Sequence, residues 1–368
     1  MEIRLDKIKW VPIVVLVFFI LLVGGCGNFT QPPIVSSVDP SQIMNTSMPN
    51  TTAETKASPR KTLLIYDDDG SLDGMAALLY LLSNPEISIQ AINISYGEAH
   101  PELYVQHMGK LLDSFGIRDI PLGAGQDMPL AGGTPFPDWL RELSDNFWDY
   151  SLSNADKVYP FQNAPELIVE TINKASEPVT IFLSGPFTNL AQALRLDPEI
   201  KNNISAVYFM GGAIYVPGNI INLTPDSDNQ VAEWNIVADP QAAKEVFESG
   251  IELFMIPLDA TNQVLFSKKD LRPWNQGGKK AKMVVDLYNS MFNRFGFKTT
   301  EIFDLTAAVI MTKPDSCVFQ QLHLDVITDV GSTLGQTIID PNSEPNIHVC
   351  LEPNVKQIKK NLNNTFSK

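Results

Sequence analysis

From residue 61 onward, short apolar segments alternate with longer segments whose apolar residues recur at helical spacing. The apolar segments that predict strands are 62–66, 88–95, 179–184, 206–210 and 252–258. The segments that predict helices are 73–84, 101–116, 164–176, 188–196 and 239–250. This alternation is typical of an α/β fold with a mostly parallel, doubly wound sheet, covered by helices on both faces. Further strands are predicted near the C-terminus, over 321–330 and 346–353.

The first 26 residues differ in composition from the rest of the chain. A basic start precedes an apolar stretch over 11–23 and the small residues before Cys26. The stretch is shorter than the roughly 20 residues of a membrane-spanning helix, and the order is typical of a secretory signal. The segment "VGGC" resembles a bacterial lipobox, which implies a lipid on Cys26 and anchoring on the extracytoplasmic face of the cell membrane. An uncleaved anchor with an incidental cysteine is the alternative.

Residues 27–58 are rich in Ser, Thr, Asn and Pro and have few large apolar residues. Such a segment cannot bury enough surface to offset its chain entropy, which predicts a disordered tether. Residues 59–368 contain no second linker and no internal repeat, so we expect one domain. The net charge of −15 argues against sequence-independent nucleic-acid binding. Cys317 and Cys350 are compatible with a disulfide or with free thiols, since export permits either.

Unusual polar segments follow each of the five predicted strands. They are 67–73, 96–100, 184–189, 211–219 and 259–263. In open parallel sheets, ligands bind outside the carboxyl ends of the strands. The sequence therefore predicts that these five segments surround a binding site.

The first of these segments, "DDDGSLD", holds Asp67, Asp68, Asp69 and Asp73. Burying like charges without a partner is costly, and a hard divalent cation with oxygen ligands would relieve the cost. Zinc is disfavoured because no Cys or His lies nearby, and the spacing does not match an EF-hand. An acidic turn satisfied by helix-start amides is the alternative, but the convergence of polar loops favours a cation site.

The stretch "LIYDDDGSL" resembles the start of the haloacid-dehalogenase-type phosphatases. That resemblance implies Asp67 as nucleophile and Asp69 as acid/base, and Ser184 fits the second motif. The later lysine motif and the paired acids after a further strand are missing.

The same stretch also resembles the Asp-x-Asp-x-Gly-x-Asp-Asp motif of the calcium-dependent nucleoside hydrolases of the inosine-uridine type. Five further segments resemble this family in the right order: "PLGAGQDMPL", "SGPFTNLAQAL", "FMGGAIYVPGN", "AEWNIVADPQAAKEVF" and "FDLTAAV". The likeness runs from about residue 62 to 350. A lone acidic motif is weak evidence, whereas five more segments in order are specific.

The resemblance implies one Ca²⁺ held by Asp69, the main-chain carbonyl of Ser184, and Asp304. Asp69 would also be the base that deprotonates the water attacking the anomeric carbon. The residues implied for the ribose hydroxyls are Asp73, Asn219, Glu233 and Asn235. The implied reaction is hydrolysis of the N-glycosidic bond of a nucleoside or related riboside, giving ribose and free base.

Three residues depart from the family pattern. Gly74 replaces the second acid of the Asp-Asp pair, Glu98 replaces an Asn, and Phe303 stands where some members have a His. We expect Glu98 to restore the carboxylate missing at position 74, with Asp67 and Asp68 in reserve.

The leaving base would then be activated without a histidine at position 303. Phe136, Trp139 and Trp148 are candidates for stacking on the base, and His100 is an alternative proton donor. Asn189 is interpreted as a structural residue at a helix start. The competing functions are a degenerate riboside-binding surface lipoprotein and a phosphatase that uses Asp67. The sequence does not fix the oligomeric state or the preferred base.

Overall fold

The structure is a computed structural model that describes residues 61–152 and 156–368. The predicted signal segment over 1–26 and tether over 27–58 lie outside the described residues. Among the described helices, none has the length and apolar character needed to cross a bilayer.

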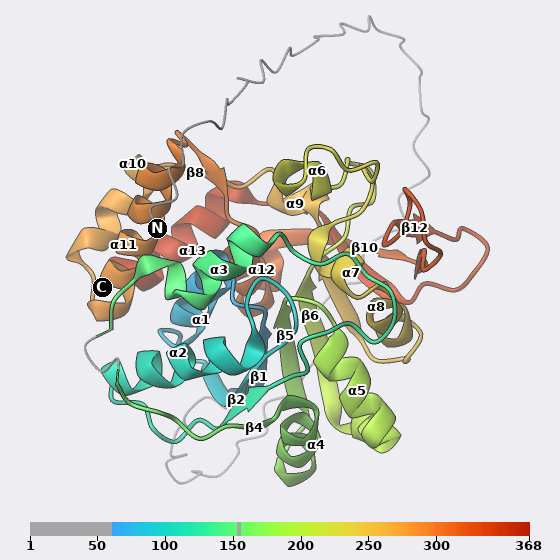
Figure 1. Ribbon diagram of the computed structural model, residues 1–368, viewed down its shortest axis with the longest axis horizontal. Helices are drawn as coiled ribbons and strands as arrows, with labels where there is room; N and C mark the ends of the chain where they lie inside the picture. The colour runs from blue at the N-terminus through green and yellow to red at the C-terminus, as the bar shows by residue number, and fades with distance from the viewer. Residues whose placement is uncertain (1–60, 153–155) are drawn as a thin grey trace, which may run out of the picture. The chain divides into compact units, whose positions relative to one another are not determined.

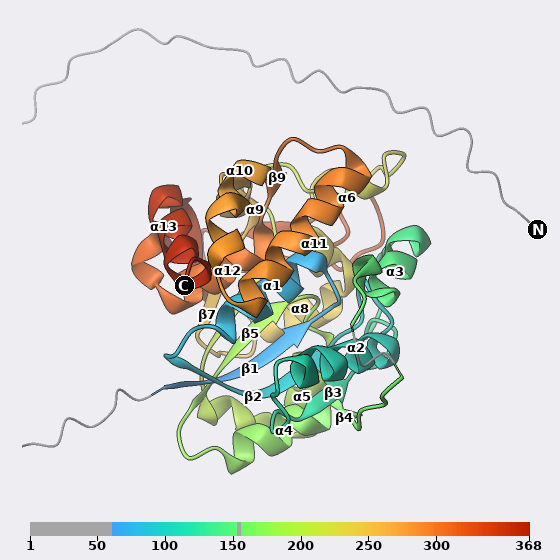
Figure 2. The same ribbon diagram turned by 90° about the vertical axis from the view of Figure 1, so that its left-hand side faces the viewer.

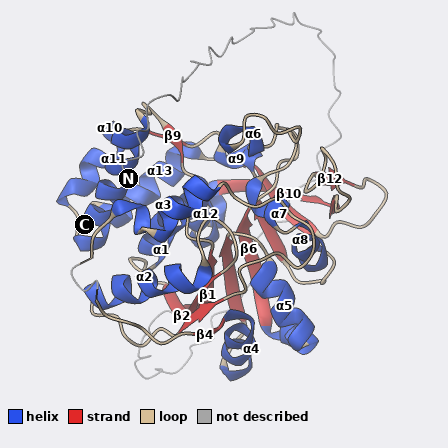
Figure 3. Cartoon of the chain, in the orientation of Figure 1, coloured by secondary structure: helices blue, strands red, loops and turns tan. Residues whose placement is uncertain are grey.

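The core of the described chain is a nine-stranded sheet (Figures 1 and 3). In spatial order its strands are β10 (Cys317–Leu322), β13 (Ile347–Pro353), β7 (Leu253–Ile256), β6 (Ile204–Met210), β5 (Val179–Ser184), β1 (Thr62–Asp68), β2 (Ile87–Ile94), β3 (Leu122–Ala124) and β4 (Gln162–Asn163). Neighbouring strands are parallel except β10 and β13, which are antiparallel. The predicted class, a mostly parallel α/β sheet with strands added near the C-terminus, is confirmed.

Helices cover both faces because successive strand residues point to opposite sides. In β1, Leu64 and Tyr66 join one core cluster, and Ile65 joins the other. The first cluster contains residues of α1 (Leu72–Leu81), α2 (Pro101–Ser114), α11 (Lys279–Phe295), α12 (Phe303–Thr312) and α13 (Val355–Phe366). The second contains residues of α4 (Ala164–Lys174), α5 (Thr188–Leu196) and α8 (Pro240–Phe247). Figure 2 shows α1, α11 and α12 on one side of the sheet and α4 and α5 on the other.

The remaining elements are short. The helices are α3 (Asp138–Asp145), α6 (Ile220–Leu223), α7 (Trp234–Ala238), α9 (Leu258–Thr261) and α10 (Lys268–Leu271). Two small antiparallel ladders pair β8 (Leu265–Phe266) with β9 (Thr300–Glu301), and β11 (Leu324–Val326) with β12 (Thr337–Ile339). The segment predicted as strand over 321–330 contains the end of β10 and all of β11. The chain leaves the main sheet after Leu322, so β11 pairs with β12 outside that sheet.

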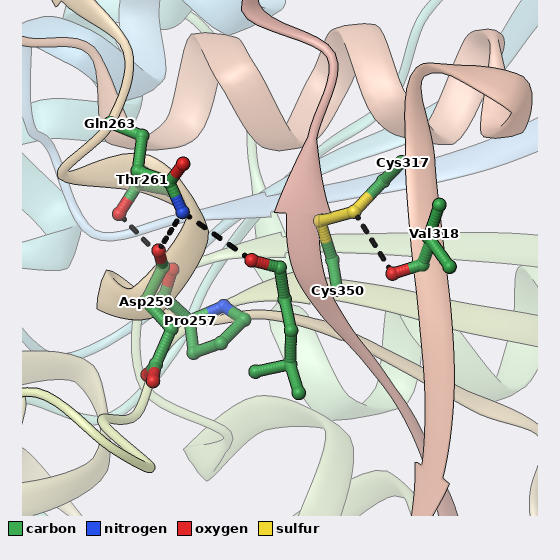
Figure 4. The surroundings of a disulfide bond; sticks show 8 residues. Pro257, Asp259, Thr261, Gln263, Cys317, Val318 and Cys350 are labelled. Carbon is green, nitrogen blue, oxygen red and sulfur yellow. Dashed lines mark hydrogen bonds between the residues drawn. A yellow bond between two sulfur atoms is a disulfide. The ribbon is translucent and has the colours of Figure 1, made fainter. Parts of the chain in front are cut away.

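Cys317 and Cys350 form a disulfide between β10 and β13 (Figure 4). The bond joins the antiparallel edge strand to its neighbour, beside the α9 turn that contains Asp259. Of the two alternatives left by the sequence, the paired one is correct.

Replacing both cysteines by alanine is expected to lower the free energy of unfolding by about 2–4 kcal/mol, because the disulfide closes a long loop in the unfolded chain. The two cysteines are 33 positions apart in the sequence. Urea denaturation of the two proteins, with and without reductant, measures the effect. Reductant should destabilise only the wild type, and equal stabilities without reductant would contradict the prediction.

Candidate active site

The candidate site lies where the strand order of the main sheet changes direction. From β1 the chain proceeds through β2, β3 and β4 on one side, and then returns to place β5 on the other side of β1. Ligands bind at such switch points, outside the carboxyl ends of the strands. In the register of β1 and β5, Asp68 stands opposite Ser184. The acidic segment and the segment after β5 therefore meet here, as the sequence predicts.

The turn after β1 connects this acidic segment to α12. Gly70 takes a φ of 97°, which favours glycine, and Ser71 then caps α1 by accepting a hydrogen bond from the Gly74 amide at 2.7 Å. The Ser71 hydroxyl also donates to Asp304 Oδ2 at 3.0 Å. Asp304 lies in the first turn of α12, so one serine links the beginnings of two helices.

Asp73 makes a second link between these helices. Its Oδ2 accepts a hydrogen bond from the Asp304 amide at 2.6 Å, and its Oδ1 accepts one from the Tyr288 hydroxyl of α11. The carboxylate of Asp73 is therefore held at the start of α12, where the helix dipole favours negative charge.

The three consecutive aspartates at the end of β1 have different partners. Asn189 Nδ2 donates to Asp67 Oδ1 at 3.0 Å, and the Ser184 hydroxyl donates to Asp68 Oδ1 at 3.0 Å. Asp69 Oδ2 accepts a hydrogen bond from the Glu98 amide at 3.3 Å. Each of the three aspartates is at most 1% exposed.

The loop after β2 approaches Asp69 closely. A Cβ atom added to Gly97 would lie 2.4 Å from Asp69 Oδ2 and 2.4 Å from its Cβ. Only glycine lets the backbone pass at this distance, and the same loop places Glu98 beside Asp69. Asp69 and Glu98, from different strands, are thus brought together, as expected for two members of one site.

Several carboxylate oxygens in this cluster are buried without a hydrogen-bond partner. They are Asp67 Oδ2, Asp69 Oδ1, Glu98 Oε2 and Asp304 Oδ1. Buried polar atoms are nearly always satisfied in native proteins, so four unpartnered carboxylate oxygens in one cluster need an explanation. Oxygens of this kind are the ligands that a hard divalent cation takes.

The pKa values of the acids in this cluster also indicate that the cluster needs a positive charge. Burial raises the pKa of Asp67 to about 8, of Asp68 to about 7 and of Glu98 to about 8. Burial and the neighbouring carboxylates together raise the pKa of Asp69 and of Asp304 well above the usual range. The groups that lower these pKa values are neutral hydrogen-bond donors, such as Asn189 and Ser184. A bound cation would favour the ionised forms.

As the side chains stand, no three His, Cys, Asp or Glu residues of the described chain are arranged to hold a metal ion. The acids gather at one edge of the sheet, but several of them point to hydrogen-bond donors instead of a common centre. The chemistry of the donors and the unpartnered oxygens fit calcium, whereas a ready ligand cage is not present.

The predicted ribose-binding residues after β6 form a connected unit. Glu233 is 2% exposed, accepts hydrogen bonds from the Gly212 and Asn235 amides at 3.0 Å, and caps α7. Asn235 Nδ2 donates to the Met210 carbonyl at 3.0 Å, and Asn219 Oδ1 accepts from the Trp234 amide at 3.0 Å.

This unit lies near the acids of β1. Burial raises the pKa of Glu233 to about 7, and its negative charge is one of the influences that raise the pKa of Asp69. The structure therefore brings the predicted metal-binding and ribose-binding groups into electrostatic range of each other.

The predicted stacking candidates have different surroundings. Phe136 is buried and stacks on Trp234 with ring centroids 4.6 Å apart, so it belongs to the core. Trp139 is 46% exposed and contacts the edge of Phe295. Trp148 Nε1 donates to the Gly70 carbonyl at 3.0 Å, which places this indole directly against the acidic turn.

Phe303, at the position where some family members have a His, and His100, the alternative proton donor, also differ in their surroundings. Phe303 is partly buried and packs against the core cluster that includes α1 and α12. His100 is not an unpaired loop histidine, because its Nδ1 lies 2.7 Å from Asp145 Oδ2 and its backbone begins α2.

Sequence reasoning missed three residues that contact or adjoin the acids. Asn189 lies in the first turn of α5, as interpreted from the sequence, and its side chain also donates a hydrogen bond to Asp67, which the sequence did not indicate. Asn93 stands opposite Asp67 in the register of β1 and β2, and both of its side-chain polar atoms are unpartnered. An Asn within the apolar end of a strand was a signal for it, whereas nothing in the sequence distinguished Tyr288 from other apolar positions of α11.

The clustered acids at the switch point of this sheet define a class of enzyme. The sequence of the chain identifies the family within that class. The sequence matches the inosine-uridine preferring nucleoside hydrolases over residues 64–360, so the chain belongs to this family. Family membership makes it a hydrolase of N-glycosyl compounds, acting on ribonucleosides. The assignment also decides between the two resemblances, since the phosphatase interpretation required a different family.

The relatives of this chain are named for different nucleoside preferences. The chain is 28% identical over 307 residues to the pyrimidine-specific ribonucleoside hydrolase RihA of Citrobacter koseri, covering 78% of this chain and 93% of the relative. The solved inosine-uridine preferring nucleoside hydrolase of Bacillus anthracis has a TM-score of 0.71 and 25% identity, over 83% of this chain and 99% of that one. The purine-preferring ribonucleoside hydrolase of Gardnerella vaginalis has a TM-score of 0.72 and 24% identity, over 83% and 98%.

Proposed function

We propose that this chain is an exported, lipid-anchored ribonucleoside hydrolase that binds one calcium ion beside Asp69 and uses Asp69 as its general base. The observation that carries the proposal is the set of unpartnered, buried carboxylate oxygens at the end of β1 and the start of α12. These oxygens lie at the switch point of the sheet, where the family assignment leads us to expect the reaction.

The residues that would hold the ion are Asp69, Asp304, Glu98 and the main-chain carbonyl of Ser184. Three of them contribute an oxygen that is buried without a partner. When bound, calcium would add positive charge among these acids and lower the pKa of water at the site.

Asp69 is placed to accept a proton from the attacking water. Its Oδ2 is oriented by the Glu98 amide, and its Oδ1 has no protein partner. The water oxygen forms a bond to the anomeric carbon as the N-glycosidic bond breaks, and the electron pair of that bond leaves with the base. The sugar passes through an oxocarbenium-like transition state, whose positive charge the nearby carboxylates stabilise.

Asp73, Asn219, Glu233 and Asn235 are proposed to hold the ribose hydroxyls. A buried polar site of this kind discriminates strongly, because a sugar that lacks a hydroxyl leaves the protein group unpaired. Trp148 is the aromatic residue best placed to stack on the base, since it contacts the acidic turn. Phe303 cannot donate a proton, which leaves stacking or His100 for activation of the base. The relatives' names include both purine and pyrimidine preferences, so the base is left unassigned.

Export and lipidation at Cys26 are part of the proposal. The disulfide between Cys317 and Cys350 supports export, because disulfides persist in oxidising compartments. Mass spectrometry of the N-terminal peptide from membrane fractions tests it, with a diacylated Cys26 as the expected result and an unmodified peptide that retains residues 1–25 as the contrary one.

The function is tested by incubating the full chain with calcium and a panel of purine and pyrimidine nucleosides, and separating the products by chromatography. We expect equal amounts of ribose and free base. Binding of nucleosides without any product would indicate the degenerate binding protein instead. Release of nitrophenol from p-nitrophenyl phosphate with magnesium would indicate a phosphatase.

Replacing Glu98 by Gln is expected to weaken calcium binding by at least about tenfold, the scale of loss seen when groups around a metal are changed. The side chain keeps its shape but loses the charge of the unpartnered Oε2. Glu102→Gln, in the exposed first turn of α2, is the matched control. Calorimetric titration with calcium measures both variants, and an unchanged affinity in Glu98→Gln would exclude Glu98 as a ligand.

A further inference from the structure

Gly74 departs from the acidic residue expected at its position, and the structure shows what occupies the space beside it. A Cβ atom added to Gly74 would lie 1.9 Å from Asp68 Oδ1 and 2.9 Å from Asp68 Cγ. The Ser71 hydroxyl would be 2.8 Å away. The carboxyl group of Asp68 therefore fills the place into which a side chain at position 74 would project.

Asp68 also departs from the expected pattern, Asp-x-Asp-x-Gly-x-Asp-Asp. That pattern does not specify an acid between its first two aspartates, where this chain has Asp68. The chain thus has an extra carboxylate at position 68 and lacks one at position 74. The number of carboxylates is therefore unchanged. The added carboxylate also lies close to the place of the missing one, because the Asp68 oxygen is where a side chain at position 74 would begin.

The surroundings of Asp68 leave it able to bind a cation. It is 0% exposed, and its Oδ1 accepts hydrogen bonds from the Ser184 hydroxyl at 3.0 Å and the Tyr66 hydroxyl at 3.4 Å. Its Oδ2 accepts one from the Gly70 amide at 3.2 Å. A carboxylate oxygen has two lone pairs, so Oδ2, with one hydrogen bond, keeps an acceptor position. Its charge acts on Asp67, Asp69, Glu98 and Asp304, the four acids of the cluster with unpartnered oxygens.

We infer that Asp68 provides the calcium site with the carboxylate that position 74 lacks. The assignment rests on the proposed function, and it adds a residue that the family pattern does not assign to the metal. Burying a carboxylate is costly, and Asp68 is buried beside other acids, Asp69, Glu98 and Asp304, whose repulsion neutral hydrogen-bond donors do not relieve.

The test is calorimetric titration of the full chain in detergent with calcium, for the wild type and three variants. Asp68→Asn removes the charge and keeps the shape. Asp239→Asn is the matched control, because Asp239 is also 0% exposed and accepts hydrogen bonds from the Leu130 amide and the Thr188 hydroxyl, where it begins α8. The third variant, D68S/S71G/G74D, removes both groups that a side chain at position 74 would meet and returns the carboxylate to that position.

We expect Asp68→Asn to lose at least about tenfold in calcium affinity, Asp239→Asn to bind like the wild type, and the triple variant to recover the affinity. Wild-type affinity in Asp68→Asn would overturn the assignment while leaving the proposed function intact. A folded triple variant that binds no calcium would overturn it too, and this arm decides the matter if Asp68→Asn does not fold. A wild type that binds no calcium would instead refute the calcium requirement of the proposed function.

Discussion

Replacing Asp69 by Asn is expected to lower kcat/KM for nucleoside hydrolysis by about 10²–10⁴-fold, the usual contribution of a general base. Asn keeps the size of the side chain and can still accept the hydrogen bond from the Glu98 amide. It cannot take a proton from water, so the loss should appear in kcat. The variant is assayed at calcium concentrations that saturate it, which separates the loss of the base from weakened metal binding.

The matched control is again Asp239→Asn, a buried aspartate whose carboxylate holds the start of α8. We expect this control to lose thermal stability and to keep its turnover while it is folded. Wild-type kcat in Asp69→Asn would show that another group accepts the proton.

Removal of calcium is expected to lower the thermal stability of the chain. A ligand that binds only the folded state at 100 times its dissociation constant stabilises that state by about 2.7 kcal/mol. For a domain of this size, the shift in Tm should be about 4 °C. The physical reason is the repulsion among the buried acids, which a divalent cation relieves and a chelator restores.

The measurement is a thermal melt of the full chain in excess calcium, in chelator, and in chelator followed by excess calcium. The third sample controls for direct effects of the chelator and should recover the Tm of the first. Identical melting curves in all three samples would contradict a calcium ion among these carboxylates.

The central part of the fold follows from the sequence because its strands are long, apolar and buried on both faces. Segments such as 62–66 and 179–184 carry this pattern, and their polar ends predicted one edge of the sheet as the site. The match of Asp68 to Ser184 in the register of β1 and β5 confirms that these ends meet.

Other parts of the fold carried weaker signals. β3 has three residues, including a glycine and an alanine, and β4 has two exposed residues, so neither has a pattern that predicts a strand. The pairing of β11 with β12 depends on contacts between distant segments, which the pattern of 321–330 does not contain.

In the site too, some residues could be predicted from the sequence, whereas others are revealed only by contacts that depend on the fold. The acids of 67–73 and Asp304 could be predicted because residue type and order reveal them. Asn189 could not be assigned its contact with Asp67, since both a helix start and an acid partner suit an Asn at that position. The closeness of Asp68 to Gly74 depends on the turn through Gly70 and on the first turn of α1, a geometry that six positions of sequence do not specify.

The most direct test of the account is a calcium titration of the full chain in which bound calcium and the rate of ribose release are measured on the same samples. We predict one binding step, with the rate rising from near zero in chelator and reaching half its maximum at the concentration that half-fills the site. Ribose release at the same rate in chelator and in calcium would contradict the account.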